Sequence, residues 1–245
     1  MFHYKTFTSV PRFRYLRYLS TGGISLPFIL ALVMFSLLLL SAPGQAAESG
    51  DPLEPVNRAT LRFNRVVDTL LFKPLAKAYE IAVPSIAKHG VRNFFGNLDD
   101  VNVVVNDLLQ GKFRQAGSDL GRVAINSTLG VGGLFNVAGN SFGLEKHNED
   151  FGQTLARWGV GSGPYVVLPL LGPSTLRDSI GLVTDTLVDP VANVDHSATR
   201  DSLAGSRAID FRARVLPFDD LIVGDEYLYI RGAYLQHREY LVEDG

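Results

Sequence analysis

Apolar residues recur at three- and four-residue steps along most of the chain after residue 50, the spacing that places side chains on one face of an α-helix. Asp51 and Pro52 are typical of a helix start. One apolar stripe then runs to Pro74 and comprises Leu53, Val56, Phe63, Val67 and Leu70. The pattern predicts further helices at residues 75–83, 86–95, 101–110, 113–129, 174–188, 197–216 and 225–242. We expect Asp99 or Asp100 to cap the helix at residue 101 and Gly111 to end it. No segment shows the sustained alternation of a strand, so the pattern predicts a mostly α fold in one domain.

Two glycine-rich apolar stretches, residues 130–139 and 159–173, interrupt the helical pattern. One interpretation is a pair of tight turns between packed helices, in which glycine supplies positive φ angles. The other is that both stretches are flexible apolar loops, which suit contact with lipid or the lining of a lipid path better than contact with water. The sequence leaves both interpretations open.

The first 46 residues have the pattern of an export signal. Four basic residues precede a stretch, residues 19–47, that carries no charge, and residues 26–40 are nearly all apolar. Small residues follow at positions 41–47, which predicts cleavage before Ala47. An uncleaved N-terminal anchor is the alternative, because residues 19–42 approach the length of a membrane span. We therefore expect a signal segment at residues 1–46 and an exported domain at residues 47–245.

Composition narrows the function classes. The 245 residues are 46% hydrophobic and include no cysteine. The lack of cysteine excludes disulfides, thiolate metal sites, a cysteine nucleophile and a thioether-linked lipid anchor. Once residues 1–46 are set aside, acidic residues outnumber basic ones and no basic stripe is present. We therefore expect no nucleic-acid binding.

One short motif points to an enzyme. Residues 139–143 match the pentapeptide G-x-S-x-G, in which Ser141 would be the nucleophile on a sharp strand-to-helix turn. The acid and base would follow in the chain as Asp189 or Asp195 and His196 or His237. However, no strand is predicted before Ser141, and a charged segment follows it. A serine hydrolase therefore stays an alternative hypothesis.

Motifs for cofactors and metals are weak or missing. Neither a Walker A motif nor GxGxxG occurs, so we expect no bound nucleotide. His147 and its acidic neighbours lack a second histidine at helical spacing. We expect a capping cluster there, with no metal and no cofactor.

Ordered motifs over residues 51–240 resemble the MlaA (VacJ) family of phospholipid-binding outer-membrane lipoproteins. The first of these motifs is DPLEPVNR at residues 51–58. The motifs that follow are NFFGNL (93–98), NDLLQG (106–111), RVAINSTLG (122–130), FGQTL (151–155), GSGPYVVLP (161–169) and TLRD (175–178). Members of this family usually carry a lipobox cysteine after the signal, and this chain has none.

The resemblance implies a ring-like helical domain on the periplasmic side of the outer membrane, associated with trimeric porins. It implies an amphipathic channel that removes mislocalised phospholipid from the outer leaflet and passes it to a periplasmic carrier. The implied removal of phospholipid maintains the lipid asymmetry of the outer membrane and involves no catalysis. A purely structural porin partner is the remaining alternative. Without a lipobox, we expect membrane attachment through apolar surface helices, porin contacts or a retained signal.

The physical task that this function implies, shielding acyl chains while facing a headgroup, gives candidate site residues. Those expected near lipid or at a channel gate are Leu134, Phe135, Val137, Val166, Val167, Leu168 and Leu170. The candidate hinge glycines are Gly130, Gly132, Gly133, Gly161 and Gly163. Arg177 and Asp178 are candidates to face a lipid headgroup, with a structural ion pair as the alternative.

Overall fold

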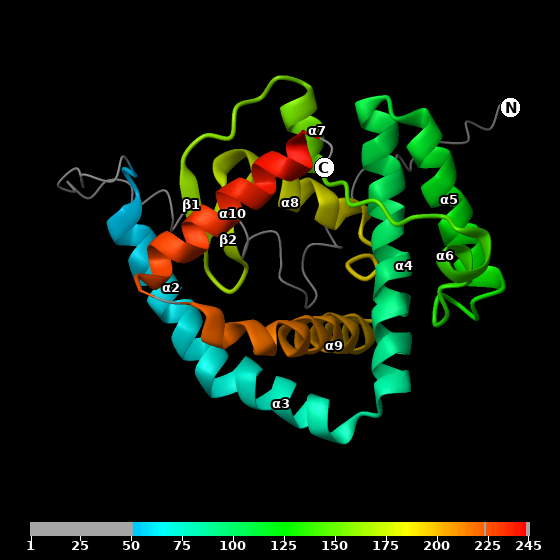
Figure 1. Ribbon diagram of the computed structural model, residues 1–245, viewed down its shortest axis with the longest axis horizontal. Coiled ribbons are helices and arrows are strands. Elements are labelled where there is room, and N and C mark those ends of the chain that lie inside the picture. The colour runs from blue at the N-terminus through cyan, green and yellow to red at the C-terminus, as the bar shows by residue number, and fades with distance from the viewer. Residues whose placement is uncertain (1–50, 223, 244–245) are drawn as a thin grey trace, which may run out of the picture.

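The computed structural model describes residues 51–222 and 224–243, so the predicted signal segment lies outside the described residues. Helices dominate the described chain, as the apolar periodicity predicts (Figure 1). The elements in chain order are α2 (Glu54–Val67), the π-helix η1 (Asp68–Phe72), α3 (Lys73–Ala82), α4 (Ser85–Gln110), α5 (Phe113–Thr128), α6 (Val137–Phe142), α7 (Phe151–Arg157), β1 (Tyr165–Leu168), β2 (Gly172–Thr175), α8 (Leu176–Val188), α9 (Ser197–Val215), the 3₁₀-helix η2 (Leu216–Leu221) and α10 (Glu226–Val242).

The helical run from α2 through η1 into α3 continues past Pro74, where the sequence pattern predicts a break. Pro74 is the second residue of α3, and the five-residue π-helix η1 lies directly before it. Proline has no N–H to donate to the carbonyl four residues back, and its ring crowds that carbonyl. A π-turn widens the hydrogen-bond ladder and accommodates the ring. The predicted break at Pro74 is therefore wrong.

Helix α4 is one helix of 26 residues, whereas the sequence predicts two helices separated by a cap at Asp99 or Asp100. That prediction is wrong because Asp100 has another role. Its side chain is fully buried and accepts a hydrogen bond of 3.1 Å from Arg122 of α5. At the other end, Gly111 has a φ of +77°, so the prediction that this glycine ends the helix is confirmed.

Strands β1 and β2 form an antiparallel hairpin inside the second glycine-rich stretch. The expectation of no strand is wrong here, because each strand has only four residues and is too short to show alternation. Tyr165 pairs with Thr175 and Leu168 with Gly172. The chain reverses through Leu170 and Gly172, both with positive φ.

The sequence predicts that Asp51 caps the first helix, and this prediction is wrong. Asp51 instead joins the start of the described chain to its last helix. Helix α2 begins at Glu54, and no side chain caps it. The Asp51 carboxylate accepts hydrogen bonds from the Leu53 N–H at 3.0 Å and from the Tyr227 hydroxyl. The Arg231 guanidinium lies 3.3 Å from the same carboxylate. The two ends of the described chain therefore meet at α10.

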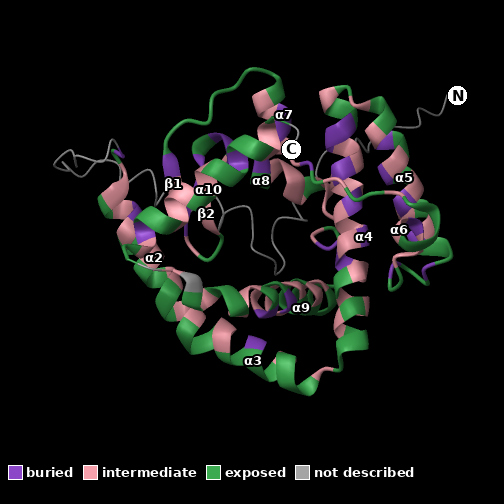
Figure 2. Cartoon of the chain, in the orientation of Figure 1, coloured by how far each residue is buried: buried purple, intermediate pink, exposed green. Residues whose placement is uncertain are grey.

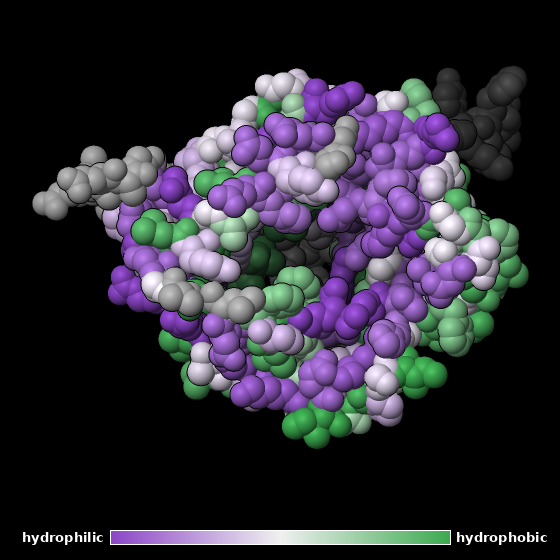
Figure 3. All heavy atoms as spheres, viewed as in Figure 1, coloured by the Kyte–Doolittle hydropathy of each residue, from purple (hydrophilic) through white to green (hydrophobic). Residues whose placement is uncertain are grey.

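The helices surround a central region like a ring (Figure 1). Helices α2 and α3 run along one side, α4 runs along another, and α9 crosses between them, in contact with both α3 and α4. The hairpin, α8 and α10 form the third side, and α5 and α6 lie on the outer side of α4. Figure 3 shows that the viewed face is hollowed near its centre, with hydrophilic side chains along much of the rim and hydrophobic ones at its left and lower edge. The expectation of a mostly α, ring-like domain is confirmed.

The hydrophobic core is small and lies beneath the hairpin. Tyr165, Val167 and Tyr227 form its buried cluster, and Leu61, Tyr234 and Leu235 pack against them. Figure 2 shows buried residues gathered on α4, α8 and the hairpin, whereas α2, α3 and α9 carry mostly half-buried and exposed residues. Outside this cluster, the described chain buries few large apolar side chains, among them Phe95, Val103 and Leu168.

Candidate functional site

Side-chain burial in this protein is inverted relative to an ordinary water-soluble domain. Among the described residues, buried polar and charged side chains outnumber buried hydrophobic ones, while large apolar side chains are exposed on most helices. In water, exposed apolar surface is unfavourable by about 25 cal/mol per Å². In lipid, polar side chains face inward and pair with one another while apolar ones face outward. The described surface therefore suits an apolar environment over part of its area.

One set of exposed apolar side chains follows α2, η1, α3 and the first turn of α4. This α2–α3 stripe comprises Phe63, Val66, Leu70, Leu71, Leu75, Ile81 and Ile86. At the corner between α3 and α4, Ile81 is 88% exposed and Ile86 is 77% exposed. These residues therefore give α2, η1, α3 and the start of α4 several exposed apolar side chains.

A second apolar surface surrounds the turn after α5. This turn patch comprises Leu129, Val131, Leu134, Phe135 and Phe142, all exposed. Figure 3 shows hydrophobic side chains gathered at the margin of the molecule over α5 and α6. The structure thus places two of the predicted lipid-contact residues, Leu134 and Phe135, on one outer surface, with Val137 half-buried beside them.

The glycines of this turn are required by its close packing. A Cβ on Gly130 would lie 2.3 Å from the Phe135 carbonyl oxygen. Gly133 has a φ of +91°, and a Cβ there would lie 2.9 Å from the Asn97 side chain. Backbone hydrogen bonds close the turn, from Gly133 N–H to Asn126 O at 2.8 Å and from Phe135 N–H to Gly130 O at 3.0 Å. The geometry is that of the tight turn between packed helices, the first of the two interpretations of this stretch.

The structure separates the predicted hairpin residues into two groups. Val167 and Leu168 are buried, and Val167 belongs to the hydrophobic core, while Val166 is half-buried. Leu170 is 46% exposed at the chain reversal, next to the exposed Leu171. Only the tip of the hairpin therefore presents apolar side chains to the surroundings.

Two of the remaining predicted glycines precede the hairpin, and the third lies in the turn after α5. Gly161 is exposed, and a Cβ there would meet no atom within 4 Å. Gly163 has a φ of +66°, and a Cβ there would lie 3.1 Å from the Leu176 Cβ. Gly132, in the turn after α5, also has a positive φ but open space around it.

Arg177 and Asp178 form the ion pair that was the alternative to headgroup contact. Both are buried, and the Arg177 Nε lies 2.9 Å from the Asp178 carboxylate. The same carboxylate accepts hydrogen bonds from Arg238 at 3.0 Å and from the Tyr234 hydroxyl at 2.8 Å. Burial alone would raise the pKa of Asp178, but the hydrogen bond from Arg177 and the charge of Arg238 hold that pKa below its usual range. This cluster ties α8 to α10.

A second polar network, which sequence reasoning missed, joins α4 to α5. Asp100 and Arg122 pair at 3.1 Å with both side chains buried, and Asp119 accepts from the His147 Nδ1 at 2.7 Å. Burial and the nearby Asp119 carboxyl raise the pKa of Asp107 to about 7. The available signal was polar residues at helical spacing on α4, where the apolar stripe of an ordinary helix would lie.

Residues 143–150 cross from α6 to α7 without regular structure and are held mainly by side chains. Arg122 donates to the Leu144 carbonyl at 2.6 Å, and Lys146 donates to the Gly96 carbonyl at 2.8 Å. Lys112 pairs with Glu149 at 2.8 Å. Between this segment and the first turn of α5 lies an open cavity of about 710 Å³.

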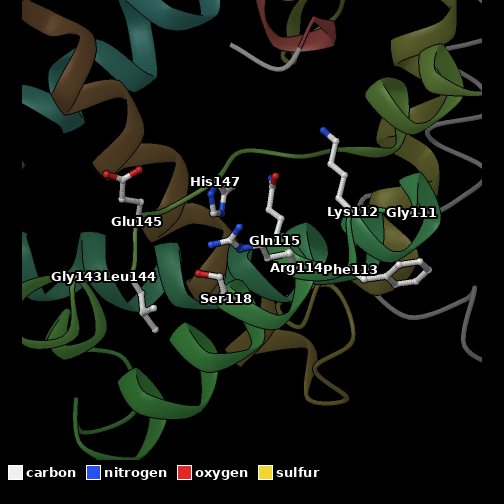
Figure 4. A pocket seen from close by; sticks show the side chains of 10 residues that line it. All are labelled: Gly111, Lys112, Phe113, Arg114, Gln115, Ser118, Gly143, Leu144, Glu145 and His147. Carbon is white, nitrogen blue, oxygen red and sulfur yellow. The ribbon is translucent and has the colours of Figure 1, made fainter.

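Both polar and apolar groups line this cavity. Figure 4 shows Arg114, Gln115, Ser118 and His147 facing one space, with the Phe113 ring directed away from them. Glu145 and the nearby Glu149 offset its basic residues, so the cavity does not have the charge of an anion site.

The serine motif does not have the structure that a nucleophile elbow requires. Ser141 lies inside the short helix α6, and both strands of the described chain come later in the sequence. Two of the candidate partners are occupied locally: His196 contacts Thr199 at 3.0 Å, and Asp189 pairs with Arg207 at 2.8 Å. The strand-to-helix context for a serine hydrolase is therefore not met.

The described residues contain no group of three or more histidine or acidic side chains placed to hold a metal ion. Within residues 51–222 and 224–243, no helix combines the length and the apolar character needed to cross a bilayer.

The structure is therefore a ring of helices with polar networks between them and exposed apolar side chains on its surface. The chain belongs to the MlaA lipoprotein family, whose model matches residues 49–241. The recognition made from the ordered motifs is confirmed.

Relatives cover most of the chain. A Shigella flexneri protein named intermembrane phospholipid transport system lipoprotein MlaA is 36% identical over 225 residues, which is 88% of each chain. The protein of the same name from Escherichia coli K12 is 35% identical over the same share. An uncharacterised protein of Rickettsia bellii is 38% identical over 197 residues, 79% of this chain and 77% of its own.

A solved structure shares the fold. It comes from work on the structural basis for maintenance of bacterial outer membrane lipid asymmetry and superposes with a TM-score of 0.69 at 35% identity. The match covers 78% of this chain and 98% of that chain.

Proposed function

We propose that this protein is a non-enzymatic component of phospholipid transport at the outer membrane, where it binds phospholipid and moves it out of the outer leaflet. The observation that carries the proposal is the inverted surface: exposed apolar side chains outside buried polar networks. The names of the Shigella and Escherichia relatives support the same function.

The physical task is to shield acyl chains from water. Moving a two-chain phospholipid through water exposes some thirty methylenes at ~0.8 kcal/mol each, roughly 25 kcal/mol in total. A protein can lower this cost by offering an apolar surface to the chains and polar groups to the headgroup. In our proposal the turn patch and the hairpin tip contact the acyl chains, and hydrophilic residues around the central hollow face the headgroup (Figure 3).

The proposal extends to location and partners. The protein lies on the periplasmic side of the outer membrane, beside trimeric porins, and delivers phospholipid to a periplasmic carrier. Because the sequence contains no cysteine, the α2–α3 stripe and the turn patch provide its attachment to the membrane in place of a thioether-linked lipid.

Mass spectrometry of lipids that copurify with gently extracted protein tests this function. We expect intact phospholipid in a defined ratio, unchanged in the Ser141→Ala variant, because a shielding protein does not cleave its cargo. Lysophospholipid and free fatty acid that vanish with Ser141→Ala would instead indicate a hydrolase. No enriched lipid would favour a structural porin partner.

A further inference from the structure

One edge of the β-hairpin is paired with side chains instead of a third strand. Strand β1 pairs with β2 on one side, and its other edge faces α2 (Figure 1). The Asn57 amide donates to the Tyr165 carbonyl at 3.0 Å and accepts from the Val167 N–H at 2.8 Å. An asparagine amide carries both a donor and an acceptor, so it can replace the backbone of a neighbouring strand.

Asn64 repeats this arrangement at the hairpin tip. Its amide donates to the Leu168 carbonyl at 2.9 Å and accepts from the Leu170 N–H at 2.7 Å. Asn57 and Asn64 are seven residues apart, about two helical turns, so both project from the same face of α2. The helix therefore holds the edge of β1 at two points, one at each end.

The two points differ in their surroundings. Asn57 is buried, and its amide also contacts the Tyr227 hydroxyl at 3.2 Å within the core. Asn64 is half-buried, and its bond to Leu170 is exposed. Hydrogen bonds in contact with water exchange more readily than buried ones, so the tip is the end that can be released.

The backbone at the tip is strained in the conformation that Asn64 holds. Leu170 has a φ of +64°, in the left-handed region that L-residues with large side chains seldom adopt. Release of both Asn64 hydrogen bonds would let Leu170 return to an ordinary φ. The exposed side chains of Leu170 and Leu171 would then change direction.

We propose that Asn64 is the positioning residue that fixes the hairpin tip, residues 168–172, and so sets how the tip contacts phospholipid. This assignment rests on the proposed function, in which the tip contacts acyl chains. Asn57 is its structural counterpart, which anchors the base of the same strand in the core.

Hydrogen exchange of the full-length protein tests the assignment, with Asn64→Ala compared with Asn57→Ala. We expect Asn64→Ala to speed exchange of the Leu170 amide at least tenfold, with helix content and the thermal midpoint unchanged. Asn57→Ala should instead lower the thermal midpoint, because it leaves buried backbone groups without partners. Copurifying phospholipid, measured by mass spectrometry, should change several-fold in Asn64→Ala.

Two further variants separate positioning from general loosening. Asn64→Asp keeps the acceptor for the Leu170 N–H but loses the donor, so its exchange rate should fall between those of the native protein and Asn64→Ala. Adding Leu170→Gly to Asn64→Ala should restore part of the protection, because glycine adopts positive φ without strain.

Two results would overturn the assignment in distinguishable ways. Unchanged exchange at residues 168–170 in Asn64→Ala, with phospholipid still bound to the native protein, would overturn the role of Asn64 alone. Absence of phospholipid from the native protein would overturn the proposed function and the assignment with it.

Discussion

Phospholipid handling is expected to be lost when Phe135 is replaced by aspartate, while the helical fold stays intact. Phe135 is 56% exposed in the turn patch, so its ring contributes little to the protein's own packing. The backbone N–H that closes the turn onto Gly130 remains available in Phe135→Asp. An aspartate in contact with acyl chains is unfavourable by about 2.5–3.5 kcal/mol at the bilayer centre, enough to reduce occupancy more than tenfold. Lipid copurification measures the bound phospholipid, and circular dichroism measures the helix content. We expect the same result for Leu134→Asp.

Asn140→Asp is the matched control for this variant. Asn140 is exposed on α6 five residues later, and the substitution adds the same charge outside the turn patch. It should leave lipid binding unchanged. Native levels of bound phospholipid in Phe135→Asp would show that the turn patch does not contact lipid.

We expect the second large effect in Arg122→Met, which should lower the free energy of unfolding. Arg122 is 4% exposed, pairs with Asp100 and lies 3.8 Å from the Asp119 carboxylate. Methionine fills similar space but leaves buried carboxylates without their main cation. Removing one partner of a buried ion pair costs about 3–5 kcal/mol. Lys146 still contacts Asp100, so we expect the lower part of that range, measured by denaturant unfolding of the purified protein.

A control variant and a double variant show whether the loss of stability comes from the buried ion pair. Arg114→Met lies on the same helix at an exposed position and should change the free energy of unfolding by less than about 0.5 kcal/mol. Adding Asp100→Leu to Arg122→Met should recover part of the loss, because the uncompensated charge is removed. If Arg122→Met unfolds like Arg114→Met, the polar network between α4 and α5 does not hold these helices together.

Much of the helical fold could be predicted from apolar spacing because most helices are amphipathic. Gly111 ends α4 as its position indicates. The failures occur where tertiary contacts override local signals. Asp100 has the chemistry of a cap, but its carboxylate serves a partner on α5 that no local pattern reveals. Pro74 has the chemistry of a helix end, but a π-turn absorbs it.

The candidate site was less predictable because hydrophobicity does not reveal which way a side chain faces. Val167 and Leu170 are both apolar members of one short segment, yet one belongs to the core and the other is exposed at the tip. That difference follows from the register of β1, which is held partly by Asn57 and Asn64 more than 100 residues earlier in the chain. Contacts at such separation leave no local pattern in one sequence.

The measurement that tests the central claim most directly is the amount of phospholipid in the outer leaflet of cells from which this gene has been removed. We predict that outer-leaflet phospholipid rises on removal and returns to its original level when the native gene is restored. An outer leaflet whose phospholipid content is the same with and without the gene would contradict the account.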